Sequence, residues 1–170
     1  MAVLQILTYP DPRLKQESRP VERFDRALAG FVRDLDETMR GGPGAAGIAA
    51  PQVGRARRIV LVDVSGRKDT PSHGPLVLIN PEIVDWEGLA VGREGCLSVP
   101  DYTGNVVRAE RIRVRARNVT GAESEYACEG FEARAIQHEV DHLNGILFLD
   151  RLVSRRNDLF RRKVYRKPRS

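Results

Sequence analysis

The chain has 170 residues and a mass of 19.0 kDa, which is enough for one well-buried core and too little for two domains of ordinary size. Its 41% hydrophobic and 30% charged residues are typical of a soluble globular protein. No apolar run approaches the ~18 residues of a membrane-spanning helix, and the first residues lack the features of a signal peptide, so we expect a cytoplasmic protein.

The net charge of +5 is unevenly distributed along the chain. From Arg151 onward there are nine basic residues and a single acidic residue, Asp158, whereas residues 1–150 are slightly acidic. We therefore expect one folded domain over residues 1–150 and a basic tail over residues 151–170. Leu159, Phe160 and Val164 would form the apolar side of a helix in this tail, and its basic side chains would be either solvated or bound to a polyanion.

Residues 1–20 contain Pro10 and Pro12, which exclude a regular helix and predict an arm laid over the domain. The following segment repeats apolar residues at intervals of three and four, which predicts an amphipathic helix that ends at the breaker of residues 41–44. These apolar residues are Phe24, Leu28, Phe31, Val32, Leu35 and Met39.

Small residues dominate the next segment, residues 45–54. Such a segment has little side chain to pack, so it is either a simple loop or a place where the backbone closely approaches a strand or a ligand. Short runs rich in β-branched residues then predict several strands, and their short connections favour an antiparallel or mixed sheet. The predicted strands cover residues 59–62, 76–79, 82–86, 106–109, 112–116 and 124–128.

Gly130 and Gly145 bracket a second predicted helix that contains the pattern His-Glu-x-x-His. In a helix, His138 and His142 lie on one face, where both imidazoles can bind one metal ion, and Glu139 lies beside that ion. The pattern also occurs by chance. Two histidines, moreover, leave a catalytic zinc-type site one protein ligand short, since such sites usually have three.

The chain has only two cysteines, Cys96 and Cys128, and a disulfide is the less expected use for them in a cytoplasmic protein of this size. A thiolate from Cys96 would complete the two-histidine site, because sulfur and imidazole both suit zinc and ferrous iron. The alternative is that Cys96 is a core thiol. We interpret Cys128 as a buried core thiol, Trp86 as a packing residue and His73 as a solvated side chain.

Three segments carry a resemblance to a known family: Gly47-Ile48-Ala49-Ala50-Pro51-Gln52, Glu94-Gly95-Cys96-Leu97-Ser98 and His138-Glu139-Val140-Asp141-His142. In their order and spacing they resemble the motifs of peptide deformylases, which remove the N-formyl group from new bacterial polypeptides. The resemblance extends from Leu7 to Arg151. It implies an α+β fold in which a central metal-binding helix packs against antiparallel or mixed β-sheets.

The resemblance also implies a role for each matching residue. One divalent metal ion, ferrous iron by expectation and zinc or nickel as alternatives, would be bound by Cys96, His138 and His142. Glu139 would act as general acid and base, and the formyl oxygen would receive hydrogen bonds from Gln52 and from the Leu97 amide. The residues that would contact the substrate are Ala46, Gly47, Glu94 and Gly95.

Two details of the motifs lead to further expectations. Ala46 stands where the family usually has a bulky aliphatic residue, which predicts a roomier pocket for the methionine side chain. Arg108 and Asp141 have opposite charges, so they either hold the helix and the Cys96 loop together or form a solvated pair.

The implied partner is an N-formylmethionyl nascent peptide, and the basic tail could contact ribosomal RNA. Two other functions fit parts of the sequence. A small metalloprotease would share His-Glu-x-x-His but would need neither Cys96 nor the Gln52 segment. A basic ribosome-associated protein with a structural metal would need no catalytic glutamate. The source that we expect is a bacterial cytoplasm.

Overall fold

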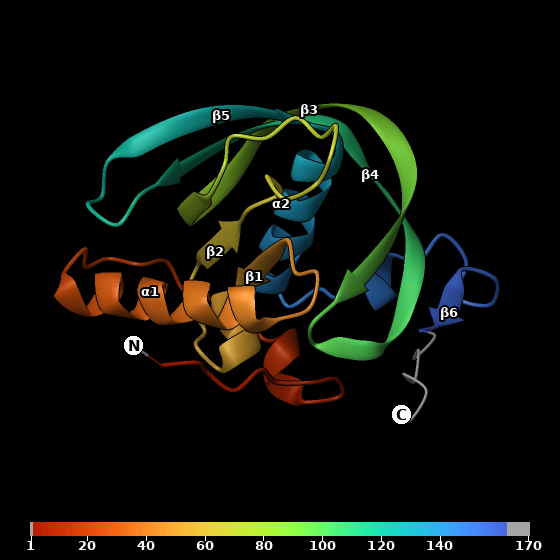
Figure 1. Ribbon diagram of the computed structural model, residues 1–170, viewed down its shortest axis with the longest axis horizontal. Helices are drawn as coiled ribbons and strands as arrows, with labels where there is room; N and C mark the ends of the chain where they lie inside the picture. Colours follow the sequence, from red (N-terminus) through yellow and green to blue (C-terminus); the bar gives the residue numbers. More distant parts are fainter. Residues whose placement is uncertain (1, 163–170) are drawn as a thin grey trace, which may run out of the picture.

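The computed structural model describes residues 2–162, in which a β-sheet is combined with two α-helices and three short 3-10 helices (Figure 1). The α-helices are α1 (Arg26–Gly41) and α2 (Gly130–Leu143), and the 3-10 helices cover Pro12–Lys15, Ala50–Val53 and Phe148–Arg151. The strands are β1 (Gly47–Ala49), β2 (Ile59–Val62), β3 (Leu76–Cys96), β4 (Val99–Arg117), β5 (Glu123–Glu129) and β6 (Leu159–Arg161). No helix within the described range is both long and apolar enough to cross a membrane.

The strands form one antiparallel sheet in the order β1-β2-β3-β4-β5, and β6 pairs with β4 outside this path. Consecutive strands are neighbours, as the short connections in the sequence predict. The expected α+β fold, with the histidine-bearing helix packed on an antiparallel sheet, is confirmed.

At β2 the sheet has one helix on each of its two faces. All four residues of β2 are therefore buried. Ile59 and Leu61 belong to the core cluster that contains α1, whereas Val60 and Val62 belong to the cluster that contains α2. Alternate residues of a strand point to opposite faces, so an uninterrupted apolar run is needed where both faces are covered. Each fully buried side chain of this kind stabilises the fold by about 1.5–3 kcal/mol.

The helix α1 follows the predicted apolar stripe, and its ends are defined by local chemistry. The Asp25 side chain accepts a hydrogen bond from the Leu28 amide at 3.0 Å, which caps the first turn. The helix ends at Gly41, where the predicted breaker begins. Leu28, Val32, Leu35 and Met39 are buried against the sheet.

The strands β3 and β4 are much longer than the sequence predicts, because each joins two predicted strands into one. The expected turn at Asn80-Pro81 is instead an irregularity within β3, where the pairing register shifts between Ile79 and Glu82. Asn80 adopts φ 52° and its side chain makes hydrogen bonds of 2.8 and 2.9 Å with the backbone of Val21. The pinned bulge allows the strand to continue to Cys96.

The outer part of the β3–β4 ribbon curves around α2, as Figure 1 shows in green. Most side chains of residues 86–93 are exposed, so this part of β3 has no apolar alternation by which the sequence could reveal it. Trp86 is 60% exposed here, and its interpretation as a packing residue is wrong.

The helix expected in the basic tail is also wrong for the part that the structure describes. Residues 155–157 form a turn, and Leu159–Arg161 form β6, paired with Tyr102–Gly104 of β4. Leu159 packs against the small cluster of Cys96, Val99 and Phe148, so an open strand edge and an apolar contact together favour a strand. Val164 and the remainder of the tail, residues 163–170, lie outside the described residues.

The N-terminal arm connects segments that are far apart in the sequence. The Leu7 amide donates to the Gln52 carbonyl at 2.7 Å, and the Tyr9 amide donates to the Ser98 carbonyl at 2.8 Å. Further along, the Ser18 amide donates to the Leu143 carbonyl at 2.7 Å. The arm is thus fastened to all three motif-bearing regions of the chain.

Gly145 shows how closely the arm is packed against the end of α2. It adopts φ 72°, and an added Cβ would collide with the Lys15 carbonyl oxygen and lie 2.6 Å from the Lys15 carbonyl carbon. We expect Gly145→Ala to lower the free energy of unfolding by at least about 3 kcal/mol, measured by urea denaturation. Gly44→Ala is the control, because Gly44 has φ 66° but open space around it, and we expect it to lose only about 1 kcal/mol. Equal losses would contradict this account.

Candidate metal centre and catalytic site

The three predicted metal ligands meet between the end of β3 and the last turns of α2. The ligand atoms of Cys96, His138 and His142 all lie within 4.8 Å of one another, and all three residues are buried. Cys96 Sγ is 3.3 Å from His142 Nε2, and the two imidazole centroids are 5.2 Å apart. One sulfur and two nitrogens make a donor set that suits zinc or ferrous iron.

Local structure explains why these side chains converge. His138 and His142 are separated by one helical turn, so they share one face of α2. Cys96 is the last residue of β3 and pairs with Val99, which leaves Leu97 and Ser98 as the two-residue turn into β4. At this turn Cys96 Sγ lies against α2, and the Leu97 amide directly follows the cysteine in the chain.

Glu94 orients His138 from behind. His138 Nδ1 donates to Glu94 Oε1 at 2.8 Å, because a carboxylate can only accept, and in the neutral imidazole Nε2 then keeps a lone pair for a metal ion. Burial alone would raise the pKa of Glu94, but hydrogen bonds from His138 and Arg108 outweigh it and hold that pKa below its usual range. Glu94 therefore stays ionised.

The electrostatic surroundings of the histidines favour a cation. Burial opposes a charge on His138, yet hydrogen bonds with Cys96 and Glu94 outweigh it and raise the pKa of this imidazole well above 6.5. Burial and the neighbouring His138 lower the pKa of His142 well below 6.5, so His142 is neutral, as a ligand must be. The residues present thus fit a divalent metal ion in both donor type and charge.

Arg108 is buried at the centre of an ion-pair network. Its Nε and Nη2 each donate to a Glu94 oxygen at 2.9 Å, and its Nη1 donates to Asp141 Oδ2 at 2.5 Å. Asp141 also accepts from Arg151 at 2.5 and 3.0 Å. The Arg108 side chain is only 4% exposed, so the alternative of a solvated pair with Asp141 is wrong. The network links β3, β4 and α2 behind the ligands.

Glu139 lies beside the ligands in an almost water-free position. Its Oε1 is 3.9 Å from His138 Nε2, and its Oε2 is a buried atom without a hydrogen-bond partner among residues 2–162. Burial raises the pKa of Glu139 to about 7, although the charge of His138 opposes this shift. A carboxylate with such a pKa can both accept and return a proton near neutral pH.

The small-residue segment passes directly over Glu139. A Cβ added at Gly47 would lie 2.8 Å from Glu139 Cγ and 3.0 Å from the Leu61 carbonyl oxygen, so only glycine fits there. Of the two interpretations of this segment, the close approach of backbone is therefore correct. The packing restricts Glu139 to one orientation.

Gln52 is held by its own short helix and by the β3–β4 turn. Its Oε1 accepts from the Ala49 amide at 2.9 Å. Its Nε2 donates to Ser98 Oγ at 3.1 Å and lies 3.5 Å from Cys96 Sγ. The amide group is thus fixed with its donor end toward the cysteine, close to the Leu97 turn.

The four residues predicted to contact the substrate lie in different surroundings. Gly47 lies against Glu139, and Ala46 is half-buried against the core beneath the sheet. Glu94 is buried, and both of its oxygens already accept hydrogen bonds from His138, Arg108 and the α2 residue Arg134. Gly95 is exposed, with the Arg162 side chain against its Cα.

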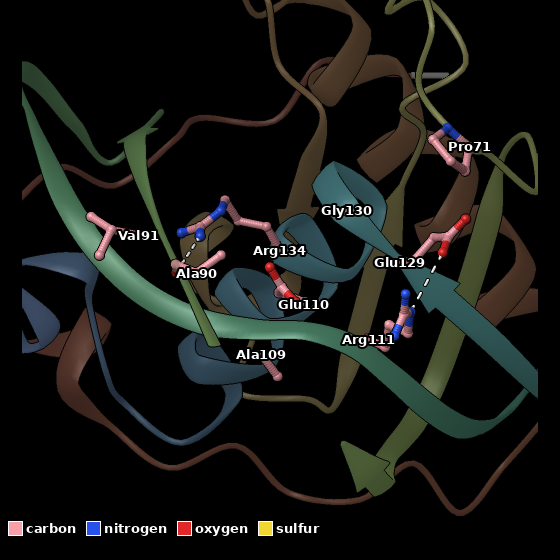
Figure 2. Close-up of a pocket in the computed structure, with 9 residues that line it drawn as sticks. All are labelled: Pro71, Ala90, Val91, Ala109, Glu110, Arg111, Glu129, Gly130 and Arg134. Carbon is pink, nitrogen blue, oxygen red and sulfur yellow. Dashed lines mark hydrogen bonds and ion pairs between the residues drawn. The ribbon is translucent and has the colours of Figure 1, made fainter. Parts of the chain in front are cut away.

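Arg134 belongs to this site, although no motif of the sequence predicts it. Its Nη1 donates to Glu94 Oε2 at 2.8 Å and to the Val106 carbonyl at 3.0 Å, and its Nη2 donates to the Ala90 carbonyl at 2.9 Å. Figure 2 shows this side chain hydrogen-bonded to Ala90, and both residues line a pocket of about 420 Å³. None of the three candidate ligands lines that cavity. A usable signal was the spacing of Arg134 one helical turn before His138.

The Arg108 network makes Asp141 a sensitive position. Asp141→Asn keeps the shape of the side chain but leaves Arg108 without part of its compensating charge in a buried setting. We expect the free energy of unfolding to fall by about 3 kcal/mol in chemical denaturation, together with a loss of bound metal. The matched control is Asp36→Asn, whose exposed ion pair with Arg40 should contribute less than about 0.5 kcal/mol. Wild-type stability and metal content in Asp141→Asn would refute this role.

Comparisons with known proteins show the family to which the chain belongs. The family model for polypeptide deformylase matches residues 3–158. A peptide deformylase of Alkalilimnicola ehrlichii is 46% identical over 164 residues, which cover 96% of this chain and 90% of that protein.

Solved structures show the same likeness. The peptide deformylase of Ehrlichia chaffeensis in complex with actinonin has a TM-score of 0.85 at 40% identity and covers 92% of each chain. The Met-Ala-Ser-bound class I type b enzyme of Acinetobacter baumannii has a TM-score of 0.81 at 38% identity, covering 89% of this chain and 99% of its own. The chain therefore belongs to the polypeptide deformylase family.

Proposed function

We propose that this chain removes the formyl group from N-formylmethionyl nascent peptides with the help of one divalent metal ion bound by Cys96, His138 and His142. Membership of the family makes the chain a hydrolase that acts on N-formylated peptides. The observation that supports the site is the convergence of one thiol and two imidazoles on the buried carboxylate of Glu139. Ferrous iron as the native metal, with zinc or nickel as alternatives, stays a prediction.

The bound ion would supply a Lewis acid that polarises a carbonyl oxygen and lowers the pKa of water toward about 7. Glu139 would accept the proton of the attacking water and later return it to the departing amine, which its pKa of about 7 allows. The products are formate and a free amino terminus, so the water supplies an oxygen to the former and its proton reaches the latter.

Gln52 and Leu97 would stabilise the formyl oxygen as it becomes negative. The Gln52 amide is fixed before substrate arrives, because Ala49 and Ser98 bind its two ends. One such preorganised donor typically contributes about 3 kcal/mol to the transition state. The Leu97 amide, in the turn after Cys96, would be the second donor.

The substrate assignment draws on the solved relatives. The Acinetobacter baumannii enzyme is bound to Met-Ala-Ser, a peptide of the kind that deformylation releases. The exposed backbone of Gly95 suits the approach of an extended peptide. The roomier methionine pocket at Ala46 and the bacterial cytoplasmic location stay predictions.

The two alternatives are weaker. A metalloprotease does not need a cysteine at the metal, nor a glutamine bonded beside it, yet both are built into this site. A structural metal in a ribosome-associated protein would not need a carboxylate with an unpartnered, buried oxygen; among residues 2–162, Glu139 has one.

The proposed role of Glu139 can be tested by formate release from formyl-Met-Ala-Ser under anaerobic conditions. We expect Glu139→Ala to lower kcat at least about 10³-fold, because the proton carrier is lost, while elemental analysis still finds one metal ion per chain. Glu129→Ala, at an exposed carboxylate that ends β5, should retain wild-type kcat. The proposal fails if Glu139→Ala keeps more than a tenth of the wild-type rate.

We further propose that the basic tail contacts ribosomal RNA. Deleting the whole tail would also remove β6, so the sharper change replaces only basic residues beyond it by Gln, namely Lys163, Arg166, Lys167 and Arg169. We expect ribosome co-sedimentation to fall and its salt dependence to weaken, because fewer phosphate contacts release fewer counterions.

A control variant changes the charge of the chain equally on the outer face of β4, through Gln at Arg111, Arg113, Arg115 and Arg117. Its binding should match the wild type. Equal binding by the tail variant and the wild type would exclude the tail as a ribosome contact.

A further inference from the structure

A second group of metal-ligating side chains lies at the opposite end of α2. It comprises His73 in the loop between β2 and β3, Cys128 near the end of β5 and Glu132 in the first turn of α2. His73 Nδ1 is 2.5 Å from Glu132 Oε1 and 3.8 Å from Cys128 Sγ, and one ligand atom from each residue lies within 4.8 Å of the others. His73 is exposed, as the sequence predicts, and its ring is in addition hydrogen-bonded to Glu132.

The composition of the chain makes this arrangement notable. There are three histidines and two cysteines in all 170 residues. Two histidines and one cysteine form the catalytic cluster, and the remaining histidine and cysteine meet at Glu132. Every imidazole and every thiol of the chain therefore belongs to one of two clusters, each with the donor chemistry of a transition-metal site.

The carboxylate of Glu132 is an independent reason to expect a cation. Its side chain is 2% exposed, and within residues 2–162 it forms no ion pair with lysine or arginine. Its two oxygens accept hydrogen bonds from His73, one from the backbone amide at 2.7 Å and one from the ring. A buried carboxylate without a lysine or arginine partner is costly, and a bound divalent ion would supply a positive charge.

We propose that His73, Cys128 and Glu132 bind a second divalent ion, Zn²⁺ by donor chemistry, in a site separate from the catalytic one. Ligands of one tetrahedral zinc ion lie about 3.5 Å apart for sulfur and nitrogen and about 3.3 Å apart for nitrogen and oxygen. The sulfur–nitrogen distance is already close to this value. The His73 ring must turn slightly away from Glu132, which its exposed loop position permits.

Proton balance on binding is simple. The Cys128 thiol, whose pKa burial and Glu132 raise to about 12, loses its proton to solvent and binds as thiolate. The proton on His73 Nδ1 moves to Nε2 through solvent, so the ring binds through Nδ1 in its neutral form. The fourth position would be taken by water on the exposed side of His73.

The expected role of this ion is to fasten the β2–β3 loop to the start of α2. The same loop already contacts this end of the helix, where the Arg67 guanidinium lies 3.6 Å from the centre of the Phe131 ring. His73 also packs edge-on against Tyr126 of β5 at 5.4 Å. A metal ion would add coordinate bonds to these contacts at the end of α2 remote from His138 and His142.

The test is the number of zinc ions that the full chain retains after saturation with Zn²⁺ and gel filtration. We expect two per chain for the wild type and one each for His73→Gln and Cys128→Ala, with formate release within about twofold of wild type in both. His73→Gln changes an exposed loop residue, so its result does not depend on refolding of the core. The zinc-dependent rise in melting temperature should shrink in both variants.

Cobalt separates the two sites spectroscopically. In Cys96→Ser the only thiolate is Cys128, so a sulfur-to-cobalt charge-transfer band on adding Co²⁺ reports the new site alone, and Cys96→Ser/Cys128→Ser should lack it. One zinc ion in the wild type, two in Cys128→Ala, or no band in Cys96→Ser would overturn the proposal. The cluster would then be a hydrogen-bonded contact between the β2–β3 loop and α2, without metal. Failure of the catalytic proposal would appear differently, as two bound ions without formate release.

Discussion

The buried carboxylate of Glu94 is the group on which both the site and the fold depend. It accepts hydrogen bonds from Arg108 on β4 and from Arg134 and His138 on α2, so a single charge joins three elements. A buried carboxylate costs several kcal/mol unless it is fully paired, and here two guanidinium groups offset that cost. The orientation of a candidate metal ligand, His138, and the docking of α2 on the sheet therefore share one interaction and cannot be altered independently.

A second constraint is steric. β1 passes so close to Glu139 that position 47 has no room for a side chain, and the resulting lack of water raises the pKa of the glutamate to about 7. The N-terminal arm then binds the backbone of Gln52 and Ser98 from outside. The groups proposed to handle the proton and the oxygen are thus fixed by backbone packing, which is the condition under which preorganised donors are effective.

The sequence predicts those helices and strands in which apolar residues recur at a regular spacing and each face is uniformly buried. α1 and β2 follow from apolar spacing because their faces are uniformly buried. The long extension of β3 could not be predicted, since both of its faces are largely exposed beyond Trp86 and its alternation carries no signal. β6 could not be predicted either, because a free edge of β4 selects the strand and that edge exists only after folding. The candidate ligands follow from motifs, whereas the one-turn spacing of Arg134 before His138 indicates only a shared helix face, and its partner Glu94 is brought to that face by folding.

The same reasoning explains why α2 can hold chemistry at both ends. Its middle is fixed by Ala133, Ile136 and Val140 in the main core, so the termini cannot shift relative to each other without breaking that packing. Buried carboxylates flank it, Glu94 near the last turns and Glu132 in the first, and each is bonded to a histidine. The Glu94 carboxylate has two arginines to balance it, while Glu132 has no such cation within residues 2–162. This asymmetry of charge, rather than the presence of a cysteine, is the strongest physical argument that a cation belongs at the first turn of the helix.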